Sequence, residues 1–267
     1  MIKLIASDLD GTLLDASKQI NDRDRAAVAR AIGEGLELCI ASGRMYAEIN
    51  AFMRPFKGRY HAVGQNGATV YHKDLRLLAS SDFEPALSSR LLQATRGIVR
   101  FIQCADDSLY VTERSSASLS YESRILSACT ERRDLEAVLA GDELRCCKIS
   151  FFGELARLNA LAAELNSRFE GRIETFISDK DCLDVMPRSV SKGAGLSRLI
   201  RELGFRRDEV ACIGDSFNDL PMFALTEHSY AMRDSRDEIR SRANHIIPSV
   251  ADAIEQIIAH NRAFKAS

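Results

Sequence analysis

The sequence of 267 residues predicts an α/β fold, a parallel β-sheet flanked by helices, with a second, α+β domain inserted into it. Strand-like apolar runs alternate with helical stretches near both ends of the chain, which is the order of right-handed parallel α/β units. Polar residues directly follow several of these runs, as they do at the ligand-binding edge of an open parallel sheet. In the middle of the chain this alternation gives way to hairpin-like strand pairs.

The first part of the chain predicts two strand–helix units. Asn21 is a good N-cap for the first helix and Gly35 a good C′ residue, because Asn accepts a hydrogen bond from the first turn and Gly adopts a positive φ. The apolar runs are short and continuous, as in strands buried on both faces. We expect strands at 2–6 and 36–41 and helices at 23–34 and 46–56.

The C-terminal part repeats this rhythm. A helical stretch ends at Gly204, and the closing segment has apolar residues at helical spacing. We expect helices at 194–203 and 250–260, strands at 210–213, 228–232 and 245–247, and a loop at 214–219 that enters a short helix.

The middle segment predicts a small α+β domain. Two apolar runs flank Asp106, Asp107 and Ser108, a pattern typical of a β-hairpin. The expected elements are strands at 101–104, 109–111, 147–152, 172–177 and 183–186 and an amphipathic helix at 154–169. The sequence therefore predicts an α/β core of residues 1–82 and 188–267 and an inserted domain of residues 83–187.

Charge and apolar patterning exclude several protein classes. With Lys+Arg 36 and Asp+Glu 38, the net charge of -2 argues against a nucleic-acid or anionic-membrane binder. No apolar run approaches the ~20 residues of a membrane helix. The acidic residues Asp8 and Asp10 come too early for a signal peptide, so we expect a cytoplasmic protein. No pattern indicates an oligomeric state.

The seven cysteines argue against a disulfide framework or a zinc site. Their number is odd and they lack C-x-x-C spacing, which fits a reducing compartment. The adjacent Cys146 and Cys147 have no evident basic or histidine partner, so a redox role is not expected.

Four predicted strand or helix ends carry polar side chains that make chemical sense together. They are Asp8 with Asp10, Ser42, Lys192, and the group Asp215, Asn218 and Asp219. So many carboxylates in one crevice require a cation, because like charges at close range are costly. Oxygen ligands suit Mg²⁺, which binds one or two carboxylates together with a substrate phosphate.

These residues resemble the four motifs of the haloacid dehalogenase (HAD) superfamily, in the right order. The segment Asp8-Leu9-Asp10-Gly11-Thr12-Leu13-Leu14 is similar to the first motif, and Ser42-Gly43-Arg44, Lys192-Gly193 and 214–222 to the others. Asn66-Gly67-Ala68, before the insertion, resembles the Cof-type branch. The resemblance implies a Rossmann-like parallel-sheet core with an inserted α+β cap that selects the substrate and closes over the crevice.

The resemblance also implies catalytic and metal-binding roles. Asp8 would be the nucleophile that forms an aspartyl-phosphate, and Asp10 the general acid and base. Asp8, the Asp10 carbonyl and Asp215 would hold Mg²⁺, with Asn218 or Asp219 in or near its shell. The structural alternative for Asp219, an N-cap of a helix that begins near Leu220, stays open.

Phosphate and substrate contacts are implied in the same way. Ser42, Gly43 and Lys192 would bind the phosphoryl group, and Arg44 and Asn66 would touch the substrate. Taken alone, Ser42-Gly43 is better interpreted as a turn and Lys192 as a solvated lysine, so their functional interpretation depends on the ordered set of motifs.

The function that follows is a Mg²⁺-dependent phosphatase of small phosphorylated metabolites, sugar phosphates or similar compounds. A phosphomutase of the same superfamily is the first alternative, since it shares the four motifs, and a non-catalytic phosphometabolite-binding protein is the second. The acid at Asp10 disfavours a P-type ATPase or a dehalogenase.

Two features depart from the expected pattern or stay neutral. The loop 233–237 is more charged than the Cof-type pattern predicts. The basic residues of the insertion are interpreted as a solvated surface rather than a substrate site; they include Arg114, Arg124, Arg132 and Arg133.

Overall fold

The computed structural model describes residues 1–122, 125 and 127–266, and the chain divides into two compact units. The first unit comprises Met1–Ala79 and Ser191–Ser267, and the second comprises Ser80–Val190. The borders expected from the sequence lie three residues away at each junction, so an α/β unit is interrupted by a second unit inserted between a strand, Leu77–Ser80, and a helix, Lys192–Glu202.

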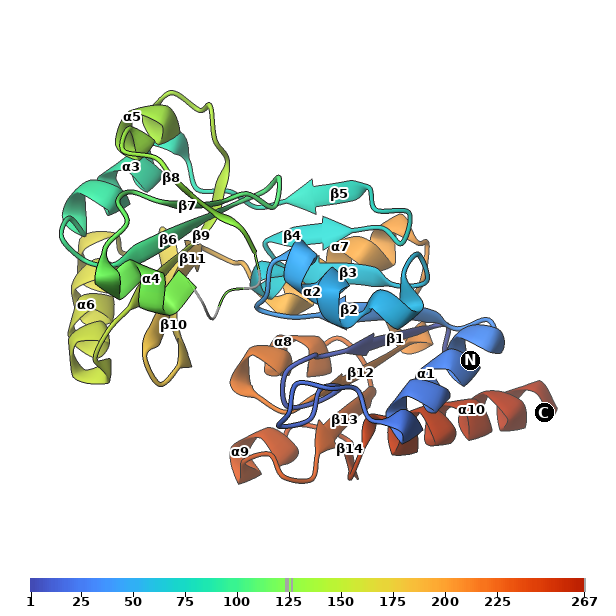
Figure 1. Cartoon of the computed structure of the whole chain (residues 1–267). Helices are drawn as coiled ribbons and strands as arrows, with labels where there is room; N and C mark the ends of the chain where they lie inside the picture. The colour runs from blue at the N-terminus through green and yellow to red at the C-terminus, as the bar shows by residue number, and fades with distance from the viewer. Residues whose placement is uncertain (123–124, 126, 267) are drawn as a thin grey trace. The chain divides into compact units, whose positions relative to one another are not determined.

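The first unit is built on an eight-stranded sheet (Figure 1). The order across the sheet is β14 (His245–Ile247), β13 (His228–Met232), β12 (Val210–Gly214), β1 (Leu4–Ser7), β2 (Glu37–Ala41), β3 (His61–Gly64), β4 (Thr69–Tyr71) and β5 (Leu77–Ser80). The first six of these strands pair in parallel, and β4 is antiparallel to β3.

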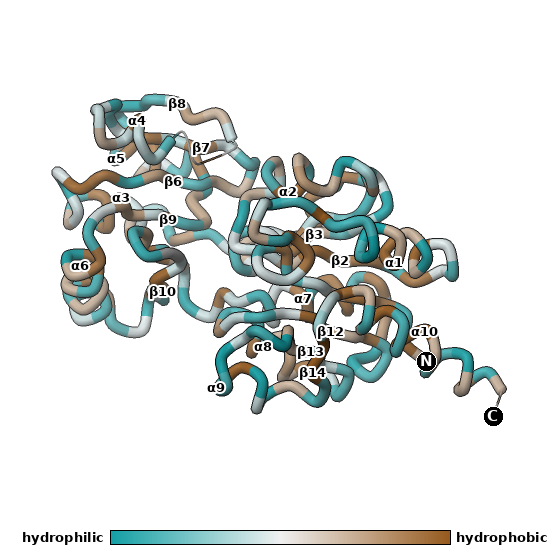
Figure 2. The backbone as a smooth tube through the Cα atoms, turned by 60° about the horizontal axis from the view of Figure 1, so that its bottom comes forward, coloured by the Kyte–Doolittle hydropathy of each residue, from teal (hydrophilic) through white to brown (hydrophobic). Residues whose placement is uncertain are grey.

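Helices cover both faces of this sheet, which explains why its central strands are apolar throughout (Figure 2). Alternate residues of β1 point to opposite faces: Ile5 joins one apolar cluster, and Leu4 and Ala6 join another. The first cluster packs against α1 (Asp22–Gly33), α2 (Tyr46–Phe52) and α10 (Val250–Ala266), and the second against α7 (Lys192–Glu202), α8 (Leu220–Phe223) and α9 (Asp237–Arg240). Helices α1 and α10 lie side by side (Figure 1).

Local sequence signals set the ends of the first two helices. The Asn21 side chain accepts a hydrogen bond from the backbone N–H of Asp24, and Gly35 has a φ of +86°, as predicted. The helix predicted at 46–56 ends early: α2 stops at Phe52 and a 3₁₀ turn, Arg54–Phe56, follows. Pro55 in that turn lacks an N–H donor, so it cannot continue the α-helical pattern.

Strands β3, β4 and β5 were not predicted from the sequence.

The second unit contains a six-stranded sheet that is mostly antiparallel. The strand order is β10 (Ile173–Asp179), β11 (Cys182–Pro187), β9 (Cys146–Phe152), β6 (Arg100–Cys104), β7 (Leu109–Val111) and β8 (Cys129–Glu131). The predicted hairpin is present as β6 and β7, but β8 pairs with β7 in parallel.

The two faces of this second sheet differ in chemistry. One face carries Ile102, Ile149 and Leu183, which pack with helices α3 (Pro85–Ala94), α5 (Leu135–Ala140) and α6 (Leu155–Arg168). The other face holds a buried ion pair of 3.1 Å between Lys148 Nζ and Asp184 Oδ2. The short helix α4 (Ser116–Glu122) completes the unit. Of the helices in this unit, the sequence predicted α6 alone.

All seven cysteines are free and buried. Burial raises the pKa of Cys147, and its Sγ lies 3.0 Å from Asp82 Oδ1. Burial also raises the pKa of Cys146. Buried thiols with a raised pKa are unreactive, so the structure gives no reason to assign a redox role to Cys146 and Cys147.

The charged residues of the second unit pair locally. Arg114 binds Glu122, Arg132 binds Asp134 and Arg133 binds Glu131. One side chain of each pair is exposed and the other is half-buried, which fits a surface in contact with solvent. Arg124 lies outside the described residues. In the described part of the chain, none of the helices has the length and apolarity that crossing a bilayer requires.

The close contact between α7 and α8 gives a test of the fold. A Cβ at Gly193 would lie 2.3 Å from the backbone oxygen of Pro221. We expect Gly193→Ala to lower the free energy of unfolding by roughly 1–3 kcal/mol, because neither helix can yield without moving backbone. Gly33→Ala, at a helical glycine with nothing within 4 Å, should be neutral or stabilising. Urea denaturation followed by circular dichroism checks both, and equal midpoints would contradict the prediction.

Candidate active site

The strand register brings the predicted acidic residues to one edge of the first sheet. Ser7, the last residue of β1, pairs with Ile213 of β12 and with Ile40 of β2. The backbone N–H of Asp8 donates to the Ile213 oxygen at 2.9 Å. Asp8 therefore leaves β1 beside the end of β12, and Asp215 follows β12 directly. Adjacent parallel strands ending together create the crevice in which such sheets bind ligands.

Lys192 is the buried cation of this site. It is the first residue of α7, whose N-cap Ser191 accepts a hydrogen bond from Ala194 N. The Lys192 Nζ donates to Asp8 Oδ1 at 2.5 Å and to Asp219 Oδ1 at 2.7 Å, and the side chain is 1% exposed. The structure thus brings three of the predicted residues together and excludes a solvated lysine.

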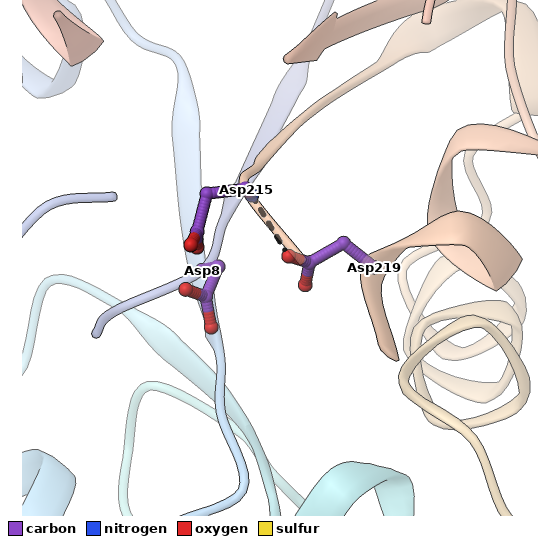
Figure 3. Close-up of side chains that lie close together, drawn as sticks. All are labelled: Asp8, Asp215 and Asp219. Atoms are coloured by element: carbon purple, nitrogen blue, oxygen red, sulfur yellow. Dashed lines mark hydrogen bonds between the residues drawn. The ribbon is translucent and has the colours of Figure 1, made fainter. Parts of the chain in front are cut away.

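The Asp219 carboxylate is occupied by donors from the protein. Besides Lys192, it accepts the backbone N–H group of Asp215 at 2.9 Å through Oδ2 (Figure 3). The same oxygen accepts the backbone N–H group of Ser216 at 3.0 Å. Asp219 precedes α8 but makes no side-chain cap of it. Its carboxylate instead fixes the loop after β12 and holds Lys192, so the helix-cap alternative for α8 is wrong.

Asp8, Asp215 and Asp219 form a compact carboxylate cluster. Each offers an oxygen, and these oxygens all lie within 4.8 Å of one another (Figure 3). Thr12 Oγ1 donates to Asp215 Oδ1 at 2.9 Å and orients that side chain. Gly11 has a φ of +82°, and a Cβ there would lie 2.7 Å from Asp215 Oδ2. The glycine therefore makes the turn and leaves room for the carboxylate.

The electrostatics of the cluster are those of a site short of positive charge. Burial raises the pKa of Asp8 well above its ordinary value, although Lys192 opposes the shift. Burial and the nearby Asp219 also raise the pKa of Asp215. Burial would lower the pKa of Lys192, but Asp219 and Asp8 outweigh it and the pKa is raised. Lys192 stays charged, and a further cation at this site would lower the raised pKa values of Asp8 and Asp215.

The donor set fits a hard divalent cation. Asp8 Oδ1 accepts from Lys192 and Asp215 Oδ1 accepts from Thr12, and the two carboxylates also lie within hydrogen-bond reach of each other, so one cation could contact both. Two carboxylate oxygens with room for water and phosphate match the preference of Mg²⁺. Asp219 has both oxygens in hydrogen bonds to the protein, and one of them still lies within 4.8 Å of an oxygen of Asp8 and of Asp215.

Asp10 stands apart from this cluster and is held as a carboxylate. Arg44 donates to it through Nε at 2.6 Å and Nη2 at 2.8 Å, and Lys18 Nζ donates at 2.7 Å. Burial would raise the pKa of Asp10, but the hydrogen bonds from Arg44 and Lys18 outweigh it and the pKa is lowered. Arg44 also contacts Glu48 Oε1 at 3.2 Å.

The loops after β2 and β3 carry the remaining predicted residues. Ser42 is buried, and its Oγ accepts the backbone N–H of Arg44 at 3.2 Å. The Asn66 backbone N–H donates to the Ser42 oxygen, and a Cβ on Gly43 would lie 3.2 Å from Asn66 Oδ1. Asn218 Nδ2 donates to Asn66 Oδ1 at 3.1 Å, and Ser216 Oγ donates to Asn218 Oδ1 at 2.8 Å. Asn66 and Asn218 therefore tie two loops of the site together.

Three residues of the site escaped the sequence analysis. Thr12 orients Asp215, Lys18 pairs with Asp10 and Glu48 pairs with Arg44. Thr12 belongs to the first motif, so its place there could have indicated a role. Lys18 and Glu48 carry no signal in sequence, because only the folded loops bring them to their partners.

Comparison with known proteins decides the family. The family model for a haloacid dehalogenase-like hydrolase matches residues 5–258. The chain belongs to this family. The resemblance stated from the motifs is thereby confirmed, and so are the Rossmann-like core with its insertion and the enzyme class, a hydrolase whose curated relatives include phosphatases.

Two curated relatives of this hydrolase carry named activities. The chain is 26% identical to the 5-amino-6-(5-phospho-D-ribitylamino)uracil phosphatase YwtE of Bacillus subtilis, over 97% of this chain and 99% of the relative. It is 25% identical to the HMP-PP phosphatase of Serratia proteamaculans, over 97% and 94%.

A solved structure shares the fold of this family member along its whole length. TM0651 from Thermotoga maritima superposes with a TM-score of 0.86 at 22% identity, covering 96% of this chain and 97% of that one. This likeness concerns the fold.

The buried lysine gives a test of the site's electrostatics. We expect Lys192→Met to lower the free energy of unfolding by roughly 3–5 kcal/mol, because two buried carboxylates lose their partner. Lys18→Met removes a lysine of 54% exposure from Asp10 and should cost at most about 1 kcal/mol. Denaturation of both variants without divalent cations measures the difference, and similar losses would contradict the assignment of Lys192.

Proposed function

We propose that this hydrolase is a Mg²⁺-dependent phosphatase of small phosphorylated metabolites, sugar phosphates among them, which acts through an aspartyl-phosphate on Asp8. The observation that carries the proposal is the contact of Asp8 with the buried Lys192, beside Asp215. A carboxylate oriented by a fixed cation at the end of a strand is suited to attack on phosphorus.

Lys192 and Ser42 are the groups that would hold the phosphoryl oxygens. Lys192 is fixed by Asp8 and Asp219, so its charge is already oriented before substrate binds. The Ser42 hydroxyl accepts one backbone N–H and keeps its own hydrogen for a phosphoryl oxygen. Gly43, between Ser42 and Arg44, has no side chain to obstruct the group. Preorganised donors of this kind stabilise the charge that develops during transfer.

In the first step an Asp8 oxygen attacks phosphorus and the bond from phosphorus to the ester oxygen breaks. The leaving oxygen takes a proton from Asp10. In the structure Asp10 is a carboxylate held by Arg44 and Lys18. Proton donation therefore requires Asp10 to take up a proton and its contacts with Arg44 and Lys18 to weaken. Arg44 would then be able to contact the substrate instead of Asp10.

In the second step water attacks phosphorus and the Asp8–phosphorus bond breaks, which releases inorganic phosphate and restores the carboxylate. Asp10 accepts the proton of this water as a general base. The lowered pKa of Asp10 suits this step, because the group is then ionised at neutral pH.

Asp8 and Asp215 are the residues that would hold Mg²⁺, with the Asp10 carbonyl as a third ligand and Asn218 or Asp219 in or near its shell. The ion would offset negative charge on the carboxylates and the phosphoryl group. The raised pKa values of Asp8 and Asp215 favour this proposal, since both carboxylates gain from a cation.

The substrate class rests on the relatives and on the inserted unit. The named relatives are phosphatases, one of them of a phosphorylated ribitylaminouracil. We infer that this chain also acts on a small phosphate ester and that Ser80–Val190 serves as the cap that selects it. Arg44 and Asn66 are the substrate contacts we assign to the first unit.

Phosphate release across a panel of sugar phosphates, nucleotides and phosphorylated uracil derivatives tests the proposal. We expect release that requires Mg²⁺, stops with chelator and differs more than about tenfold between substrates. Asp8→Asn should lower kcat by at least about a thousandfold, roughly 4 kcal/mol of barrier.

Asp22→Asn is the matched control, because it makes the same change at a fully exposed carboxylate. It should leave kcat unchanged. No release from any substrate with Mg²⁺, or turnover that survives in Asp8→Asn, would contradict the proposal.

A further inference from the structure

A cavity of about 390 Å³ lies within the second unit. Its lining comes from the segment 96–100 between α3 and β6, from 111–118 after β7, and from Glu136 of α5. All of these residues belong to Ser80–Val190. The volume is that of a pocket for a small metabolite, and neither the catalytic residues nor the family motifs account for it.

Arg100 brings a buried positive charge to this cavity. It is the first residue of β6 and is 5% exposed. Its Nη1 donates to the Thr95 oxygen at the end of α3, but its Nε is buried without a hydrogen-bond partner. Among the described residues no carboxylate forms an ion pair with Arg100. A buried guanidinium in this state is costly unless an acceptor is supplied.

The other polar groups of the lining do not meet this need. Glu136 is engaged on both oxygens by Arg96, at 2.9 and 2.6 Å. Thr112 Oγ1 is a second buried atom without a partner. The cavity lining therefore combines Arg100 and Thr112, each with one polar atom that lacks a partner, with the Arg96–Glu136 ion pair and the exposed Glu113.

We propose that this cavity binds a small carboxylate, held by the free edge of the Arg100 guanidinium and by the Thr112 hydroxyl. With Nη1 turned to Thr95, the edge formed by Nε and Nη2 remains, and its two parallel N–H groups match the two oxygens of a carboxylate. A phosphate dianion fits less well, because the exposed Glu113 and the paired Glu136 also line the cavity.

Binding there ties together three segments of the second unit. Arg100 opens β6, Thr112 follows β7 and Thr95 ends α3. A ligand that satisfies Arg100 and Thr112 stabilises this corner of the unit by mass action. The site is independent of the phosphatase chemistry proposed for Asp8.

Residue-resolved NMR titration of the full chain with sodium acetate, against sodium chloride at equal ionic strength, tests the proposal. We expect saturable shifts of the Gly97 and Thr112 amides, with the Gly214 amide of the first unit unmoved. Thr112→Val should weaken binding about tenfold, the loss of one hydrogen bond to a charged group. Arg100→Lys keeps the charge but loses the two-donor edge and should weaken binding at least as much.

Arg133→Lys, at an exposed arginine outside the cavity lining, is the control and should bind acetate like the parent chain. Inorganic phosphate should shift these two amides less than acetate does at equal concentration. Absence of saturable acetate shifts, equal affinity in Thr112→Val, or stronger binding of phosphate at these amides would overturn the proposal. Phosphate-ester hydrolysis measured on Thr112→Val should be unchanged, and the titration is informative whether or not the chain hydrolyses esters.

Discussion

The ammonium group of Lys192, enclosed between the carboxylates of Asp8 and Asp219, is the interaction on which the site depends. Three buried charges in so small a volume are tolerated because each has a partner of opposite charge and both oxygens of Asp219 accept hydrogen bonds. The same contact joins the start of α7 to the ends of β1 and β12. The fold of the first unit and its chemistry therefore rest on one set of bonds.

Many helices and strands of the first unit could be predicted from the sequence, because apolar runs and capping residues mark them locally. Continuous apolar runs such as 210–213 mark strands covered on both faces, and Asn21 and Gly35 mark the ends of a helix. The short strands β3 to β5 and the helices α3, α4 and α5 lack such periodicity or clear caps. Their structure depends on packing against distant segments, which a single sequence does not display.

The site was predicted in composition but not in detail. The order of the motifs was enough to select Asp8, Asp215 and Lys192, and the structure joins all three. The hydrogen-bond partners of the other two acids could not be predicted. Asp219 accepts from Lys192 and from two backbone N–H groups, and Asp10 accepts from Arg44 and Lys18. These roles depend on which oxygen meets which donor, and that information arises only in the folded loops.

The central claim is that Asp8 takes up the phosphoryl group. Rapid acid quench during turnover with Mg²⁺, followed by peptide mass spectrometry, tests it most directly. We expect a single phosphoryl group on the peptide that contains Asp8. Hydroxylamine should remove this group, because it cleaves acyl phosphates. Steady turnover with no phosphorylated Asp8 at any quench time, or with the group on another residue, would contradict it.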